Sequence, residues 1–232
     1  MRVLWHYNSH RHLEEYALSS AFFNRSDFLK SHADVLVTCN NDKLTQNDLR
    51  KFCSYDCKFD IVKTTNPKNG VHTGQFVALN ETFHRFYEYD YVIHTTPDVY
   101  LVNDHSLIEL LKEEEHSDNH MIVDYHPYHP HCESLYCTDF FVFKPRVVHN
   151  FFGESFEPTQ DCRSIEHHLY RSIYKHSIPH RKICRGRTSL TWQVDDMGLI
   201  HNHNTDIIRN ILSNNIMPDE RTAYSHNHVR TK

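Results

Sequence analysis

Asp98 is the residue for which the sequence predicts the most specific chemistry. It follows residues 91–95, a β-rich apolar run of the kind that forms a buried strand. Thr96 and Pro97 end this run, because the residue before a proline is held extended and proline has no backbone donor. A carboxylate just past the carboxyl end of a strand lies where open α/β sheets bind ligands, and one or two such groups can hold a divalent cation on a diphosphate. The alternative is an ordinary Pro-Asp turn before the apolar run 99–102.

The strands expected early in the chain end in loops that are rich in amide side chains. Asn8 follows the first strand, Asn40 the second, and Asn66 and Asn69 with Gly70 the third. In a parallel sheet these loops lie together at one edge, where amides can pair with the donors and acceptors of a nucleobase and a ribose. Asparagine and glycine are also ordinary turn formers, so a structural role is the alternative for each loop.

Helices and strands are expected to alternate along the chain. Apolar runs predict strands at residues 2–7, 33–38, 59–63, 91–95, 99–102, 121–125, 138–145, 190–193 and 198–200. Helical spacing predicts helices from residue 13 onward and at residues 44–54, 75–87, 105–115, 164–176 and 207–212. This order favours an α/β protein with a mostly parallel central sheet flanked by helices. No linker divides the chain, so we expect a single domain.

Composition excludes several classes of protein. The chain has 232 residues, of which 39% are hydrophobic, which suits a globular domain. A net charge of -5 gives no general affinity for nucleic acid. No apolar run approaches the roughly 18 residues that span a bilayer, and the first residues carry no signal-peptide core. The seven cysteines are odd in number and scattered, which favours reduced thiols in the cytoplasm over a disulfide framework.

The run around Asp98 resembles the Asp-X-Asp region of GT-A nucleotide-sugar glycosyltransferases, in the variant whose apolar strand ends in X-Pro-Asp-Val. Asp98 stands at the position of the direct metal ligand. Thr96 replaces the first acid, which in the family usually serves the ribose or the metal indirectly. Residues 66–70, followed by Gly74, are similar to the Asn-X-Gly region that precedes the metal strand in family-2-like members. There a glycine-rich turn lets the backbone approach the donor.

Two further segments resemble catalytic parts of this family. Glu166 and His167 open a predicted helix and resemble the Glu-Asp motif, in which an acid is the catalytic base of inverting members. Because His167 replaces the aspartate, either residue can take that role, and a helix dipole also favours an acid here without any catalysis. Asp139 begins a strand similar to the one that borders the acceptor side, where it either orients an acceptor hydroxyl or caps a turn.

An apolar strand that ends in histidine resembles the C-terminal metal-ligand histidine of many GT-A enzymes. His201 directly follows such a run, and His203 projects from the same side if the strand continues. Neutral imidazole is a good ligand for Mn²⁺-like ions. In a chain with 22 histidines, a chance match is the alternative.

The resemblance implies a single-domain GT-A glycosyltransferase. Residues 1–104 would form the nucleotide-sugar-binding half, residues 105–204 the acceptor side, and residues 205–232 a C-terminal helix and tail. It further implies a UDP- or GDP-sugar donor, a hydroxyl acceptor on a glycan or glycoprotein, Mn²⁺ or Mg²⁺ as the cofactor, and inversion at the anomeric carbon. The chain is also similar to small soluble glycosyltransferases of large DNA viruses, and a viral origin would place it in the host cytoplasm.

Two other functions remain open at this point. A non-catalytic nucleotide- or sugar-binding protein of the same fold is favoured by Thr96 and His167, which both stand at acidic positions of the family. A zinc protein is the third possibility, because Cys53 and Cys57, and likewise Cys132 and Cys137, are separated by only a few residues. The irregular spacing of these pairs is not that of common zinc sites.

Overall fold

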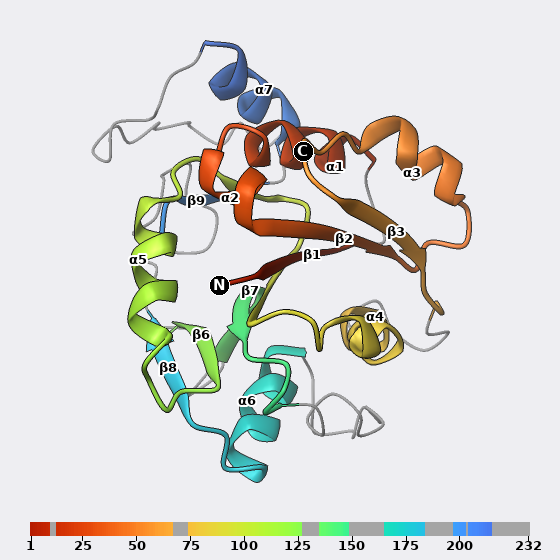
Figure 1. Cartoon of the computed structure of the whole chain (residues 1–232). Helices are drawn as coiled ribbons and strands as arrows, with labels where there is room; N and C mark the ends of the chain where they lie inside the picture. The colour runs from red at the N-terminus through yellow and green to blue at the C-terminus, as the bar shows by residue number, and fades with distance from the viewer. Residues whose placement is uncertain are drawn as a thin grey trace, which may run out of the picture.

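A central sheet organises the computed structural model, which describes residues 1–9, 13–66, 74–126, 135–148, 165–183, 197–202 and 204–214. In this part of the chain, seven strands form the sheet in the order β3-β2-β1-β4-β7-β6-β8, and β5 pairs with β9 in a second sheet (Figure 1). The strands are β1 (Val3–Ser9), β2 (Ala33–Cys39), β3 (Phe59–Lys63), β4 (Tyr91–Thr95), β5 (Val99–Leu101), β6 (Met121–His126), β7 (Leu135–Phe143), β8 (His180–Ile183) and β9 (Leu199–His201). The helices are α1 (Leu13–Phe23), α2 (Asp27–His32), α3 (Gln46–Phe52), α4 (Gly74–Thr82), α5 (His105–Glu114), α6 (Ile165–Lys175) and α7 (Thr205–Ser213).

The strand order places a switch point between β1 and β4. β1 pairs in parallel with β2 on one side and with β4 on the other. The chain runs from β1 to β2 and β3 before it returns to β4, so the connections leaving β1 and β4 diverge. Such an edge is where open α/β sheets bind ligands. β7 is antiparallel to both β4 and β6, whereas the remaining pairs of this sheet are parallel, which confirms the expected mostly parallel sheet.

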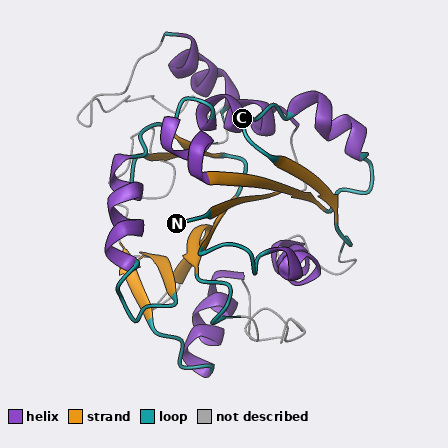
Figure 2. Ribbon diagram, in the orientation of Figure 1, coloured by secondary structure: helices purple, strands orange, loops and turns teal. Residues whose placement is uncertain are grey.

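Helices cover both faces of the central sheet (Figures 1 and 2). Alternate residues of a strand point to opposite faces. Trp5 of β1 therefore belongs to one apolar cluster, to which α1, α2, α3 and α5 contribute, whereas its neighbour Leu4 belongs to a second, to which α4 and α6 contribute. Because both faces are buried, the inner strands are apolar almost throughout rather than alternating with polar residues.

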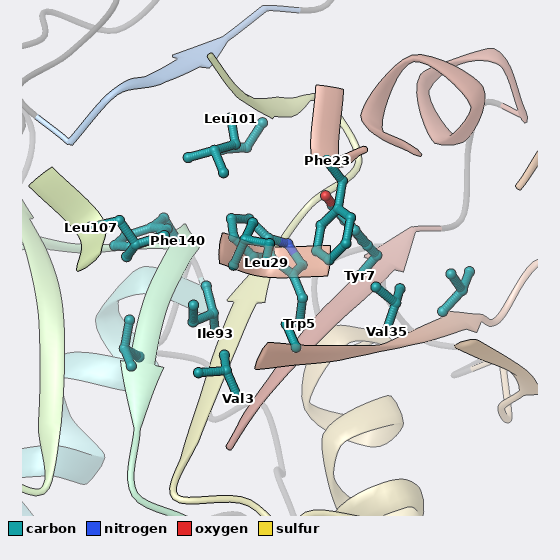
Figure 3. Packing of buried hydrophobic residues seen from close by; sticks show 14 of the residues in the cluster. Val3, Trp5, Tyr7, Phe23, Leu29, Val35, Ile93, Leu101, Leu107 and Phe140 are labelled. Carbon is teal, nitrogen blue, oxygen red and sulfur yellow. The ribbon is translucent and has the colours of Figure 1, made fainter. Parts of the chain in front are cut away.

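Trp5 ties β1 to the end of β4, and Figure 3 shows its side chain in the core near Phe23. Its side chain is fully buried and meets Phe23 of α1 edge to face, with ring centroids 5.8 Å apart. Its Nε1–H donates to Oγ1 of Thr95 over 2.8 Å. Burying a ring of this size stabilises the fold by on the order of 3 kcal/mol. The strand end that precedes Asp98 is therefore fixed from within the core.

A third cluster holds the small sheet against the rest of the molecule. Tyr100 of β5 and Ile200 of β9 pack with Phe22 of α1 and Ile208 of α7. α7 is capped by Asn204, whose side chain accepts from two backbone N–H groups of the first turn. This packing holds β9 against β5, next to the end of β4.

Most of the predicted elements are confirmed. The strands at residues 59–63 and 91–95 have the predicted bounds, and the predicted helix 75–87 ends at Thr82 and continues as a 3₁₀ turn, Phe83–Arg85. α2 and β8 were not expected, because α2 has only six residues and β8 is a polar edge strand, His-Arg-Lys-Ile, that pairs with β6. The strand predicted at 190–193 lies outside the described residues. None of the described helices is both long enough and apolar enough to cross a membrane.

Candidate active site

Asp98 lies in the turn between β4 and β5, and its backbone is held from two sides. Its carbonyl accepts from the backbone N–H of Asn202, 3.0 Å away, just after β9. The preceding carbonyl, of Pro97, accepts from the hydroxyl of Ser19 in α1. Asp98 is only 8% exposed. The structure thus places this carboxylate at the carboxyl edge of β4, beside the switch point.

β9 brings His201 to Asp98. The small sheet pairs Val99 of β5 with His201. Nε2 of His201 lies 3.2 Å from Oδ2 of Asp98, within hydrogen-bond distance, and Nδ1 lies 3.3 Å from Oδ2 of Asp139. One imidazole therefore contacts two carboxylates. β9 ends at His201, so the strand does not continue toward His203, which itself lies outside the described residues.

Asp139 lies inside β7 rather than at the start of a strand. β7 begins at Leu135, three residues before the predicted start at residue 138. The carbonyl of Asp139 accepts from the backbone N–H of Thr96 over 3.2 Å, which joins β7 to the end of β4. Oδ2 of Asp139 also accepts from the thiol of Cys137 over 3.2 Å. The sequence pointed to Asp139 as an acceptor-side residue but not to its contact with His201.

Glu15 and Tyr100 are buried polar residues of this region that the sequence analysis did not single out. Glu15, in the first turn of α1, is 5% exposed, and Tyr100 in β5 is fully buried. Burial raises the pKa of Tyr100, and the negative charges of Glu15 and Asp98 raise it further. The phenol is therefore neutral at ordinary pH. Its oxygen has no hydrogen-bond partner among the described residues. Nothing in the sequence of the predicted helix indicated that Glu15 is buried, because burial depends on how the helix packs in the fold.

Asn8, Asn40 and Gly74 meet at the ends of β1 and β2. Nδ2 of Asn8 donates to the carbonyl of Gly74 over 3.3 Å. A Cβ on Gly74 would lie 1.9 Å from Nδ2 of Asn40, so the close approach requires glycine. Both asparagines are buried, and the structure gives neither amide oxygen a hydrogen-bond partner within the described ranges. The expected cluster of amides at this edge is thus present for these two residues.

Other candidates lie elsewhere or beyond the described ranges. Asn66 is exposed, and its Nδ2 donates to Oδ2 of Asp42 over 2.9 Å, so its side chain is engaged in the loop after β3. Glu166 and His167 lie in the first turn of α6, as predicted, and α6 contributes to the apolar cluster shared with α4. Asn69 and Gly70 lie outside the described residues.

Asp98 and His201 form the pair that can hold a divalent cation. Their Oδ2 and Nε2 atoms lie 3.2 Å apart, and adjacent ligand atoms on an octahedral ion with bonds of about 2.1 Å are about 3.0 Å apart. Carboxylate oxygen and imidazole nitrogen both suit Mn²⁺. Within the described residues, no three histidine, cysteine, aspartate or glutamate side chains are grouped to hold an ion.

The cysteines that the structure describes give no support to a zinc site. Cys53 and Cys57 belong to no group of potential ligands in the part of the chain that the structure describes. Burial raises the pKa of each thiol to about 12, which disfavours the thiolate that zinc requires. Cys137 donates to Asp139, and Cys132 lies outside the described residues.

The fold is similar to that of several solved transferases. The mannosyltransferase PcManGT from Pyrobaculum calidifontis, solved with GDP-Man and Mn²⁺, matches with a TM-score of 0.57 and 12% identity, over 79% of this chain and 55% of that chain. The 4-diphosphocytidyl-2C-methyl-D-erythritol synthase from Anaerococcus prevotii matches with a TM-score of 0.56 and 7% identity, over 92% of this chain and 97% of that chain. TarS from S. aureus matches with a TM-score of 0.51 and 12% identity, over 79% of this chain and 58% of that chain.

These similarities establish the fold of the protein. It has the α/β architecture of GT-A-like nucleotide-sugar transferase domains, which nucleotidyltransferases share, so the fold class expected from the sequence is confirmed. The chain spans 55% of the length of PcManGT. No model of a protein family and no characterised protein sequence matches the chain.

Proposed function

We propose that this protein transfers a sugar from a UDP- or GDP-sugar to a hydroxyl group of a glycan or glycoprotein, with Mn²⁺ or Mg²⁺ as the cofactor. The observation that carries the proposal is the pair Asp98 and His201, whose Oδ2 and Nε2 atoms lie 3.2 Å apart at the switch point of the sheet. The two side chains are 11% and 14% exposed. A carboxylate and an imidazole that are both largely buried and lie this close together suit a hard divalent cation.

Asp98 and Nε2 of His201 would hold the ion at the donor diphosphate. When bound, the ion neutralises the charge that builds on the leaving nucleotide. Thr96 stands where the family has its first acid, and its Oγ1 has no hydrogen-bond partner among the described residues. We assign to this hydroxyl a contact with the ribose, which a neutral oxygen can make as donor or acceptor.

Asn8 and Asn40 would bind the nucleoside part of the donor. The amide oxygens of both residues are buried acceptors, and Nδ2 of Asn8 is already committed to the carbonyl of Gly74. A nucleobase N–H is the complementary donor for such an oxygen. The turn that contains Asn69 and Gly70 stands shortly before Gly74 in the sequence, and we assign it to the same subsite.

Glu166 would act as the catalytic base. It removes the proton of the acceptor hydroxyl while the oxygen attacks the anomeric carbon. A bond forms between that oxygen and the carbon, the bond to the diphosphate breaks, and the nucleoside diphosphate leaves with the electron pair, which inverts the configuration. The position of Glu166 in the first turn of α6 supports this role. His167 occupies the second position of the motif and is the alternative base.

Sugar transfer fits the residues better than nucleotidyl transfer. Residues 8–12, which include the last two residues of β1 and the three residues after it, read Asn-Ser-His-Arg-His and contain no glycine. Glycine-rich loops wrap the phosphates of a nucleoside triphosphate with their backbone N–H groups, and this segment lacks that freedom. A cation held by Asp98 and His201 is therefore the better anchor for a diphosphate. The two reactions are separable, because one releases a nucleoside diphosphate and the other inorganic pyrophosphate.

Donor hydrolysis with Mn²⁺ tests the proposal. We expect a UDP- or GDP-sugar to raise the melting temperature only with Mn²⁺, and hydrolysis to release the nucleoside diphosphate. Asp98→Ala should abolish this release, whereas Asp34→Asn, which changes a carboxylate on β2 at the opposite edge of the sheet, should retain it. Glu166→Gln should bind nucleotide and lose turnover. Full activity of Asp98→Ala would overturn the assignment.

A non-catalytic binding protein is the second candidate. It is favoured by Thr96 and His167, because both stand at acidic positions of the family, where the metal ion or the acceptor would lose the support of a carboxylate. Calorimetry that finds nucleotide-sugar binding, with no product from any donor, would favour it. Release of pyrophosphate from a nucleoside triphosphate would instead favour nucleotidyl transfer.

A further inference from the structure

His201 lies between two carboxylates that come from different strands. Its Nε2 is 3.2 Å from Oδ2 of Asp98, and its Nδ1 is 3.3 Å from Oδ2 of Asp139. Asp98 follows β4 and Asp139 belongs to β7, whereas His201 ends β9. The two ring nitrogens therefore contact separate acids, and their roles can be distinguished.

Backbone hydrogen bonds fix the relative positions of these three residues. The N–H of Thr96 donates to the carbonyl of Asp139 over 3.2 Å, and the N–H of Asn202 donates to the carbonyl of Asp98 over 3.0 Å. The first bond links Asp139 with a residue two positions before Asp98, and the second links Asp98 with the residue after His201. The backbones that carry the three side chains are thus held together where β7 meets the end of β4 and where the end of β9 meets the turn after β4.

A neutral imidazole carries one N–H and one lone pair, and a metal ion takes the lone pair. If the ion binds at Nε2 with Asp98, the proton must be on Nδ1, where Asp139 is the group in contact. Histidine ligands of metals generally donate their second ring N–H to a carboxylate or carbonyl, which fixes the tautomer and the ring orientation. Asp139 is the more exposed acid, at 27% against 11% for Asp98, and it already accepts from the thiol of Cys137. Both facts suit a supporting role.

We propose that Asp139 is a positioning residue that accepts the Nδ1 proton of His201 and so presents the Nε2 lone pair to the metal ion beside Asp98. The proposal rests on the proposed metal-dependent function. It gives Asp139 a different task from that of orienting the acceptor. It also explains why a carboxylate inside β7 lies within 3.3 Å of a histidine from a distant part of the chain.

Binding of Mn²⁺ with the nucleoside diphosphate present, measured by the electron paramagnetic resonance of free Mn²⁺, tests this role without relying on turnover. Loss of such a supporting carboxylate typically weakens metal binding 10- to 100-fold, and we expect that loss in Asp139→Ala. Asp139→Asn should lose less, because its amide oxygen can still accept from Nδ1–H. Asp34→Asn is the matched control, since Asp34 is 23% exposed, close to the value for Asp139, and lies at the opposite edge of the sheet.

The His201→Ala background separates positioning from direct ligation. If Asp139 acts through His201, then Asp139→Ala should weaken Mn²⁺ binding no further once His201 is alanine. A further loss in that background, or binding by Asp139→Ala within twofold of the unchanged protein, would overturn the positioning role. Absence of Mn²⁺ binding by the unchanged protein would instead count against the proposed function itself. Urea unfolding of each variant shows whether a change in binding reflects a change in folding.

Discussion

The Nδ1 atoms of His6 and His94 lie 2.9 Å apart in the middle of the sheet, where both side chains are fully buried. Thr38 donates its hydroxyl proton to the carbonyl of Tyr7, so Nε2–H of His6 must donate to Oγ1 of Thr38, 2.9 Å away. Nδ1 of His6 is then an acceptor, and Nδ1–H of His94 is its donor. A proton added to Nδ1 of His6 would set two N–H groups against each other. A proton added to Nε2 of His94, which is buried and has no hydrogen-bond partner among the described residues, would leave a buried charge without a partner.

We predict that acid destabilises the protein through this histidine pair. Burial lowers the pKa of His6 from its ordinary 6.5 to about 3, and burial together with His6 lowers the pKa of His94 well below 6.5. Below pH 6.5 the unfolded chain takes up protons that the folded protein excludes, so stability is complete above that pH and falls as the pH decreases toward 3. The slope reaches up to roughly 1.4 kcal/mol per pH unit for each histidine.

Urea unfolding between pH 7.5 and 4.5 measures this slope. The double variant His6→Leu with His94→Phe replaces both histidines with apolar side chains. Its free energy of unfolding should decrease less steeply with falling pH than that of the unchanged protein. Exposed histidines titrate alike in both proteins and cancel in the comparison. Equal slopes in the two proteins would contradict the assignment.

Gly74→Ala should disrupt the asparagine pair at the ends of β1 and β2. The new Cβ would lie 1.9 Å from Nδ2 of Asn40, so the amide or the start of α4 must move. Overpacking of this kind costs roughly 1–3 kcal/mol, and we expect nucleotide binding to weaken with it. Calorimetric titration with nucleotide measures the effect. Val77→Ala in the same helix serves as the control, and a Gly74→Ala protein that binds like that control would refute the role of the close approach.

Gly198→Ala should disturb His201 from three residues away. Gly198 has a φ of +75°, and a Cβ there would lie 1.9 Å from the carbonyl oxygen of Asn103. Positive φ alone costs a residue with a side chain about 1–2 kcal/mol. The same glycine's carbonyl accepts from the backbone of Val102 and Asn103, so a shift would move β9 against β5. We expect a lower melting temperature and weaker Mn²⁺ binding. A variant that is less stable but binds Mn²⁺ as well as the unchanged protein would contradict the expected effect on His201.

Glu114 should matter far more to stability than its neighbour Glu113, although both contact Arg181. The side chain of Glu114 is 3% exposed and that of Glu113 is 61% exposed. Burial alone would raise the pKa of Glu114, but hydrogen bonds from Ser117, Arg181 and Asn119 lower it on balance. Glu114→Ala leaves these donors without their acceptor and should cost roughly 1–3 kcal/mol, whereas Glu113→Ala should cost less than about 0.5 kcal/mol.

Urea denaturation of the two variants checks this contrast. Arg181 belongs to β8, so the comparison also reports how firmly this edge strand is held to α5. Equal losses of unfolding free energy in the two variants would show that the buried ion pair contributes no more to stability than the exposed one.

Local patterns were enough to predict much of the fold. The apolar run 91–95 and its stop at Thr96-Pro97 gave β4 with its exact bounds, because period, β-branching and proline geometry act within a few residues. α2 was missed although Ser26 accepts from the N–H of Leu29 as an N-cap, since a helix of six residues shows too few turns for a periodic signal. β8 was missed because an edge strand needs no apolar face.

The sequence by itself determined most of the order of helices and strands and the place of Asp98 just past the carboxyl end of β4, because these follow from neighbours along the chain. Only the tertiary structure decided that Asp139 and Asp98 flank His201, that Asn40 meets Gly74, and that His6 meets His94. These contacts depend on strand order and register, in which residues far apart in the sequence are joined by backbone ladders. No spacing of residues along a single chain contains that information.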